Sequence, residues 1–262
     1  MRILKLILAS SLYLFGQESI PGIVNPIYEG KLSVSTDGIV SKFYLKEGDI
    51  VKKGQVILKL DDKLQKLETI RRKLVLDDTT QLDSLRKSLR IMKDILSKKE
   101  SLFKNTKALS LNELNQLKIQ YINAKGELDT LISNEKKEKV EYEISKNVLN
   151  YYNLKSQVDG VITYIKPKLG EWVQVGSEIV TIVNTKTCFV EIDLDIASLK
   201  KLSLNSKVTV EIKDGENTIK KEGSVDFISA VADSSSSLVR AKIYFDNSDD
   251  SVIPGVTASI IF

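Results

Sequence analysis

Residues 82–103, with the sequence LDSLRKSLRIMKDILSKKESLF, decide the fold of this chain. Their apolar residues recur at alternating steps of three and four, which is the spacing of a heptad seam on an α-helix. The seam consists of Leu82, Leu85, Leu89, Met92, Leu96 and Phe103. Only Lys99 interrupts the series. This pattern predicts a long helix that packs along one side against another helix.

A second apolar series with the same spacing follows a short polar break at residues 105–110. Ser110 and Glu113 have the spacing of a capping box, so we expect the second helix to begin at about Leu111. Its seam consists of Leu114, Leu117, Tyr121, Ala124, Leu128 and Leu131, and it resumes at Tyr142, Leu149 and Tyr152. Two facing seams predict an antiparallel hairpin over residues 63–152, a rod of about 60 to 70 Å at 1.5 Å per residue.

The first seam continues toward the base of the rod through Arg71, Leu74 and Asp78, before it reaches Leu82. This eleven-residue interval locally unwinds a supercoil. If the arms pair symmetrically about the turn, Asp78 faces Glu138 and the lysines beside it. We therefore expect a hydrated waist with charge pairs, which bends or exchanges amide hydrogens faster than the segment near the tip.

The composition of the 262-residue chain argues against catalysis. It contains no histidine, which is the commonest general base and metal ligand. The single cysteine, Cys188, lies in an apolar run and is expected to be a buried small hydrophobe. The net charge of +4 comes from 39 basic and 35 acidic residues, which alternate along the helices as on the solvated faces of a coiled coil. We therefore expect no catalytic site, no cofactor and no metal, and no nucleic-acid partner.

The N-terminus has the pattern of a secretory signal. A basic start precedes the apolar run Leu6–Phe15, which is too short to span a bilayer as a mature helix. A buried first strand is the alternative. We expect residues 1–16 to be a signal peptide and residues 17–31 to be a linker or a strand of a barrel, and export places the protein in the periplasm.

An internal repeat surrounds the hairpin. Three glycines recur after 122 positions with the same internal spacing: Gly38, Gly48 and Gly54 match Gly160, Gly170 and Gly176. Short apolar runs between them predict strands joined by glycine turns, in which each glycine holds a conformation that a side chain would oppose. Neither half is large enough to bury a core alone. We therefore predict that residues 32–62 and 153–184 form one β-sandwich.

Residues 185–262 alternate apolar and polar side chains with a period of two, which is typical of β-strands. A short helix is expected at residues 196–202, and Asp214-Gly215 predicts a hairpin turn. The predicted strands are residues 189–194, 207–212, 224–228, 238–245 and 258–262. Five strands and a helix predict a small β-barrel, because closure removes exposed strand edges.

The motifs TDGIV and EGDIVKKG in residues 36–54, with DGVI and GEWVQVG in residues 159–176, resemble the split lipoyl/biotinyl-like domain of the membrane fusion proteins. These are the periplasmic adaptors of tripartite efflux pumps, here of the resistance-nodulation-division (RND) type. The resemblance implies an elongated multidomain α+β fold, with a helical coiled-coil hairpin inserted between the two halves of a lipoyl-like β-sandwich and followed by a β-barrel. Since the chain ends at Phe262, we expect no membrane-proximal domain. The composition resembles that of spirochaete members.

The family resemblance also implies a function. It identifies a non-catalytic adaptor, associated with the inner membrane, that joins an inner-membrane transporter to an outer-membrane channel protein and self-associates into a ring. An adaptor of an ABC-type exporter or of a type I secretion system is an alternative. A lipoyl or biotin carrier and a structural coiled-coil protein without a channel partner are two others.

In the family, the hairpin tip binds the channel. By position, the resemblance assigns this role to Lys99, Leu102, Phe103, Ala108, Leu109 and Ser110. Phe103 also continues the seam, and Ser110 also fits an N-cap, so both have a purely structural explanation. A carrier would instead modify a lysine on a tight turn between the halves. Lys63 lies near that point but is expected to be an unmodified residue in the first turn of the hairpin.

Overall fold

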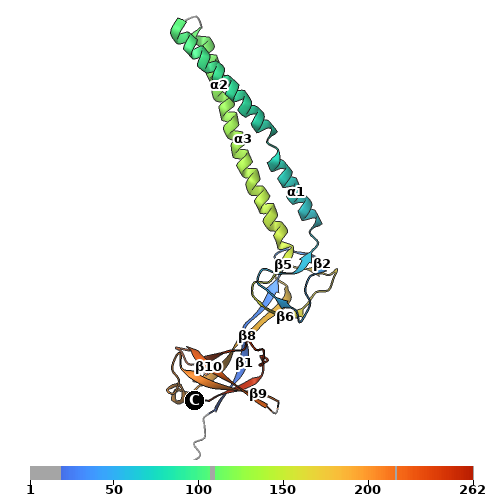
Figure 1. Cartoon of the computed structure of the whole chain (residues 1–262), viewed down its shortest axis with the longest axis vertical. Coiled ribbons are helices and arrows are strands. Elements are labelled where there is room, and N and C mark those ends of the chain that lie inside the picture. The colour runs from blue at the N-terminus through green and yellow to red at the C-terminus, as the bar shows by residue number, and fades with distance from the viewer. Residues whose placement is uncertain (1–18, 107–109, 216, 262) are drawn as a thin grey trace, which may run out of the picture.

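The computed structural model describes residues 19–106, 110–215 and 217–261. The expected signal peptide and two tip residues, Ala108 and Leu109, lie outside the described residues. The described chain forms a helical hairpin at one end, a β-sandwich in the middle and a β-barrel at the other end (Figure 1). The predicted α+β fold, with its hairpin inserted between two β-halves, is confirmed.

The hairpin consists of α1 (Lys63–Asp77), α2 (Thr80–Thr106) and α3 (Leu111–Tyr151). Every predicted seam residue of α2 and of the facing half of α3 is buried or half-buried. Leu82, Leu89 and Leu114 are the most buried, with at most 7% of each residue exposed. The heptad seam is therefore confirmed between α2 and α3, which form the half of the rod that includes the tip.

The first arm is not one continuous helix, because Asp78 and Thr79 separate α1 from α2. The Asp78 carboxylate accepts a hydrogen bond from the backbone N–H of Thr80 at 3.2 Å, and the Thr79 hydroxyl donates to Asp83 at 2.9 Å. These bonds satisfy polar groups where α2 begins. Asp78 lies near Glu138 as expected, but it forms no ion pair with another described residue, and its carboxylate instead caps a helix. The charge pair between the arms lies closer to the base, between Arg72 and Glu141 at 3.7 Å.

Below this break, α1 turns a polar side toward α3. The hydroxyls of Thr69 and Ser145 lie 2.8 Å apart, and both residues are buried. The predicted seam through Arg71 and Leu74 is wrong, since Leu74 is 66% exposed. The reason is that the break interrupts the heptad register, which allows two small hydroxyl side chains to meet between α1 and α3.

We expect the amide hydrogens of residues 79–82 to exchange about tenfold faster than those of residues 86–96, because the first turn of α2 lacks intrahelical partners for its N–H groups. Residues 131–138 of the continuous helix α3 are expected to stay protected. Hydrogen exchange read by mass spectrometry on short peptides measures both arms at once. Equal protection across the break and the tip-side half would show that the break is closed in solution.

The sandwich is built from two four-stranded layers. One has the order β5-β4-β2-β7, and the other has the order β1-β8-β6-β3. The bounds are β1 (Ser19–Ser33), β2 (Gly38–Phe43), β3 (Ile50–Val51), β4 (Val56–Leu60), β5 (Asn153–Lys155), β6 (Gly160–Ile165), β7 (Trp172–Val173) and β8 (Glu178–Leu194). The edge strands are exchanged between the halves. Strand β3 belongs to the first half and pairs with β6 of the second half. Strand β7 belongs to the second half and pairs with β2 of the first half. Each half therefore completes the sheet of the other.

The two copies of the sequence repeat form equivalent hydrogen bonds, which gives the sandwich a two-fold pseudosymmetry. Asp159 accepts a hydrogen bond from the N–H of Lys53 at 2.7 Å, and Asp37 accepts the equivalent bond from Val175 at 2.6 Å. These bonds join the halves. Four of the repeated glycines, Gly48, Gly54, Gly170 and Gly176, have φ between 81° and 88°. Gly38 and Gly160 do not have positive φ; a Cβ on Gly160 would lie 2.6 Å from the carbonyl oxygen of Val183.

The barrel strands are β9 (Lys207–Asp214), β10 (Asn217–Ile228), β11 (Val239–Asp246) and β12 (Thr257–Ile261), together with β1 and β8. They pair in the order β1-β12-β9-β10-β11-β8, and β8 pairs back with β1. Besides the five strands predicted in residues 185–262, β1, which lies in the segment expected to be a linker or a barrel strand, closes the barrel and buries Val24 in its core. The helix α4 (Ile196–Leu199) is shorter than predicted. Because β1 and β8 run through both modules, they connect the sandwich directly to the barrel (Figure 1).

Cys188 lies in the barrel core and is fully buried. Burial raises the pKa of its thiol to about 11, so the thiol is protonated at neutral pH and is a poor nucleophile. The expectation of a small buried hydrophobe is confirmed by its position. None of the helices in the described ranges is both long enough and apolar enough to cross a membrane.

Candidate functional site

The tip of the hairpin is held by ion pairs between the two arms. Lys99 lies 3.6 Å from Glu113, and Lys118 lies 2.9 Å from Glu100. The lysine that interrupts the predicted seam therefore has a partner within the chain. Exposed pairs of this kind contribute about 0 to 1 kcal/mol each, so they align the arms more than they stabilise them.

The two apolar tip residues Leu102 and Phe103 differ in burial. Phe103 is half-buried and continues the seam, whereas Leu102 is 46% exposed. Ser110 occupies the N-cap position of α3 with an extended backbone, but its side chain makes no capping hydrogen bond. The expected capping box is therefore wrong: Glu113 lies near Lys99 on the other arm, and Ser110 is exposed.

The base of the hairpin is fixed by a buried carboxylate. Asp62 is 5% exposed and pairs with Lys59 at 2.9 Å and Lys66 at 3.2 Å. Burial opposes ionisation, but the hydrogen bonds from these lysines outweigh it and hold the pKa of Asp62 below its ordinary value. Lys63 begins α1, and its side chain is 86% exposed. Its place in a helix, and not on a tight turn between the halves, gives the carrier hypothesis no support.

A second surface lies between the sandwich and the barrel. It is a groove of about 680 Å³ with mostly apolar walls. The sandwich contributes Ile50 and Val161, and the loop between β11 and β12 contributes Val252, Ile253 and Pro254. Ile50 and Ile253 are 75% and 76% exposed, although both are large and apolar. Exposed apolar residues that cluster in a groove, unlike scattered ones, mark a binding surface.

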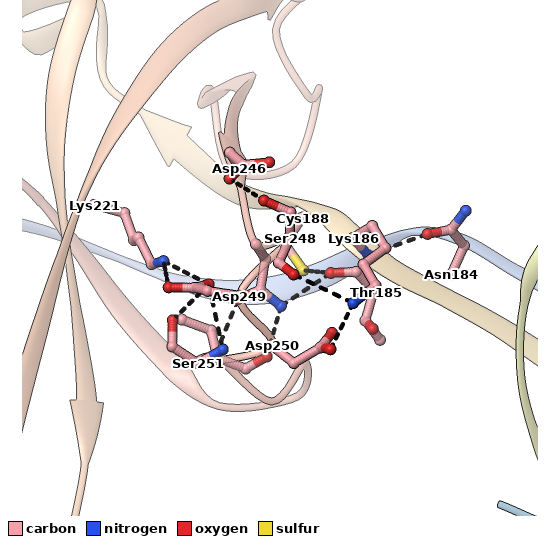
Figure 2. Close-up of polar contacts among 12 residues, drawn as sticks. Asn184, Thr185, Lys186, Cys188, Lys221, Asp246, Ser248, Asp249, Asp250 and Ser251 are labelled. Carbon is pink, nitrogen blue, oxygen red and sulfur yellow. Dashed lines mark hydrogen bonds and ion pairs between the residues drawn. The ribbon is translucent and has the colours of Figure 1, made fainter. Parts of the chain in front are cut away.

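The barrel side of this groove is fixed by Asn247, which is fully buried. Its amide nitrogen donates to the carbonyl oxygens of Thr185 and Val252, both at 2.9 Å, and its amide oxygen accepts from the N–H of Val252 at 3.0 Å. Figure 2 shows the surrounding loop, where Lys186 reaches Asp250 and Lys221 reaches Asp249 at 2.7 Å. These contacts attach the loop to β8 and to β10.

Sequence reasoning missed Asn247 and the groove. Residues 247–251 read as a polar turn, and no signal distinguishes Asn247 from the polar residues beside it. The groove joins residues that are about two hundred positions apart, so it follows from the docking of the modules. By contrast, the tip residues were found because they lie next to one another at the end of a periodic pattern.

No family model matches this chain. It is 26% identical over 230 residues to an uncharacterised protein of Haemophilus influenzae, and this match covers 87% of the chain. The chain spans 52% of that protein, about half the length of the curated relative it matches.

Solved structures show the same architecture. MacA of Actinobacillus actinomycetemcomitans is similar with a TM-score of 0.80 and 22% identity, over 94% of this chain and 78% of MacA. The membrane fusion protein Spr0693 of Streptococcus pneumoniae is similar with a TM-score of 0.58 and 14% identity, over 93% of this chain and 98% of Spr0693. The chain therefore has the fold of the membrane fusion proteins. The resemblance drawn from the glycine motifs is confirmed at the level of the fold.

Proposed function

We propose that this chain is a non-catalytic periplasmic adaptor, which links an inner-membrane efflux transporter to an outer-membrane channel. The observation that carries the proposal is the rod that projects from two β-modules. Its helix α3 has 41 residues. At 1.5 Å per residue that length is about 60 Å, which suits a bridge between proteins in two membranes. The absence of histidine from the chain also favours a role without catalysis.

The tip is proposed to contact the channel. Leu102 and Ser110 are exposed, and neither is needed to hold the arms together. Lys99 can contribute its charge while it stays near Glu113. The neighbouring tip residues, Phe103, Ala108 and Leu109, are part of the same proposed surface.

The β-modules are proposed to contact the transporter and neighbouring copies, so that several adaptors form a ring at the inner membrane. An RND-type transporter is the first candidate. ABC-type exporters and type I secretion systems remain alternatives, and the identity of the transporter that purifies with the chain decides among them.

The test is co-purification from cell envelopes, with the intact chain compared with a variant in which a short Gly-Ser turn replaces residues 85–131. We expect the variant to lose the outer-membrane channel and to keep the inner-membrane transporter, because the base of the rod and both β-modules are unchanged. Retention of both partners would contradict the assignment of channel binding to the tip.

A finer comparison uses Ser110→Ala, with Ser101→Ala as a matched control on the exposed surface of α2. Because Ser110 makes no capping bond, its replacement should leave the helix stable and weaken only channel association. Equal channel binding by both variants would exclude a role for the Ser110 hydroxyl.

A further inference from the structure

The two edge strands of the sandwich carry equivalent exposed apolar residues. Ile50 begins β3 and Trp172 begins β7, and the two are 122 positions apart, which is the offset of the internal repeat. They are 75% and 61% exposed. Because β3 ends one sheet and β7 ends the other, the pseudosymmetry places these two residues on different edges of the module.

The two edges differ in shape and charge. Ile50 lies in the groove beside the barrel, and Lys52 lies at the rim. At the other edge, the equivalent of Lys52 is Gln174, and Val175, which is 59% exposed, replaces Lys53. One edge is therefore hollow, and its charged lining is balanced between Lys52 and Lys186 on one side and Asp159 and Asp250 on the other. The other edge projects an indole and an apolar side chain next to the carboxylate of Glu171.

We propose that the groove of one copy of this chain binds the Trp172 edge of a second copy. Tryptophan is enriched among the residues that carry most of the binding energy at protein interfaces, where it packs into desolvated pockets. Lys52 in the lining of the groove can pair with Glu171, which precedes Trp172 in the second copy. The inference rests on the proposed function and deepens it, since it names the surface through which adaptors join.

A contact between two different surfaces is head-to-tail. Such a contact leaves one free groove and one free tryptophan edge after each addition, so it continues into a ring when the rotation between copies closes and into an open filament when it does not. A two-fold dimer, in contrast, would require one surface to be complementary to itself. The difference between the edges of Ile50 and Trp172 therefore favours the head-to-tail arrangement.

The hairpin supports this arrangement independently. The first arm, residues 63–106, has twelve basic and six acidic residues, whereas residues 111–151 have six basic and seven acidic residues. Parallel rods joined head to tail can place the basic arm of one copy beside the weakly acidic arm of the next. Rods related by a two-fold axis bring like arms together, and two basic arms repel.

The chain contains its own probe, because Trp172 is the only tryptophan. The full chain is studied over a wide concentration range by sedimentation velocity and intrinsic fluorescence. We expect the emission maximum to move to shorter wavelength over the same concentrations at which the sedimentation coefficient rises. Absence of association, or association without an emission shift, would overturn the proposal.

Two surface variants test the two sides of the contact. Ile253→Asp should weaken association at least tenfold by placing a charge in the groove, and Trp172→Glu should do the same from the other side. Val231→Asp is a matched control for the groove variant, because Ile253 and Val231 are each 76% exposed. Equal association of Ile253→Asp and wild type would overturn the assignment of the groove.

Mixing the two variants distinguishes the geometries. The Ile253→Asp chain keeps an intact tryptophan edge, and the Trp172→Glu chain keeps an intact groove. A head-to-tail contact predicts that each stays monomeric alone and that the mixture forms a one-to-one dimer with blue-shifted emission. A mixture that stays monomeric would refute the contact. Envelope co-purification with the variant that lacks residues 85–131 tests the adaptor role separately. A negative result in the association experiment therefore does not affect the test of the adaptor role, and the reverse also holds.

Discussion

Replacement of Asn247 by aspartate is expected to lower the free energy of unfolding by about 3 kcal/mol at neutral pH. The buried amide donates two hydrogen bonds to carbonyl oxygens of Thr185 and Val252. In Asn247→Asp, a carboxylate of nearly the same shape would face these two oxygens as a third acceptor. Urea unfolding followed by circular dichroism measures the loss.

The loss in Asn247→Asp is expected to depend on pH. Burial among carbonyl oxygens raises the pKa of a carboxyl group above its value in the unfolded chain. A group whose pKa is raised in the folded state contributes most to the free energy of unfolding at a pH below its unfolded-state pKa. This contribution is lost as the pH rises through the folded-state pKa. The variant should therefore be closest to wild type at pH 4 and least stable at pH 8.

Asn217→Ala is the matched control, because Asn217 is an exposed asparagine in the same barrel, and its change should stay within about 0.5 kcal/mol. If Asn247→Asp unfolds like Asn217→Ala at every pH, the loop around Asn247 does not hold the barrel side of the groove in solution.

The second large effect is expected in the hairpin. Leu114→Ala should destabilise the tip-side half of the rod by about 3 kcal/mol, because it removes a side chain from the seam and leaves a cavity. Leu114 is 4% exposed and comes from a helix whose apolar contacts are confined to one side. Helical circular dichroism during heating measures the loss as a transition at lower temperature.

The β-modules should not follow the hairpin in this variant. The cores of the sandwich and the barrel are separate clusters that contain no residue of the α2–α3 seam. Ile119→Ala is the control on the same helix, since Ile119 is 58% exposed and its truncation creates no cavity. A barrel that melts together with the hairpin in Leu114→Ala would show that the modules unfold as one unit.

Local patterns in the sequence predicted most of the fold. The heptad seam through Leu89 and Leu114 predicted which sides of α2 and α3 meet, because a period near 3.5 keeps the apolar series on one side of each helix. The repeat of Gly38 at Gly160 predicted two halves of one sandwich. These signals depend on residues close together in the chain or on exact spacing, and both can be read without coordinates.

The predictions failed where a local signal competed with a longer-range contact. Ser110 and Glu113 have capping-box spacing, but Glu113 pairs with Lys99 on the opposite arm. The seam through Leu74 failed because the Asp78–Thr79 break changes the register. In both cases the outcome depends on how two distant segments align, which a periodic pattern does not specify.

The sequence by itself determined the order of the parts: a hairpin between two halves of a sandwich, followed by a barrel, with the tip residues at the far end of the rod. Only the tertiary structure decided how the parts meet. The exchange of β3 and β7 places Ile50 and Trp172 on different edges, and Asn247 positions the loop that carries Ile253. The physical reason is that periodicity reports which side of an element is buried, whereas a groove between modules depends on contacts among residues that no sequence pattern links.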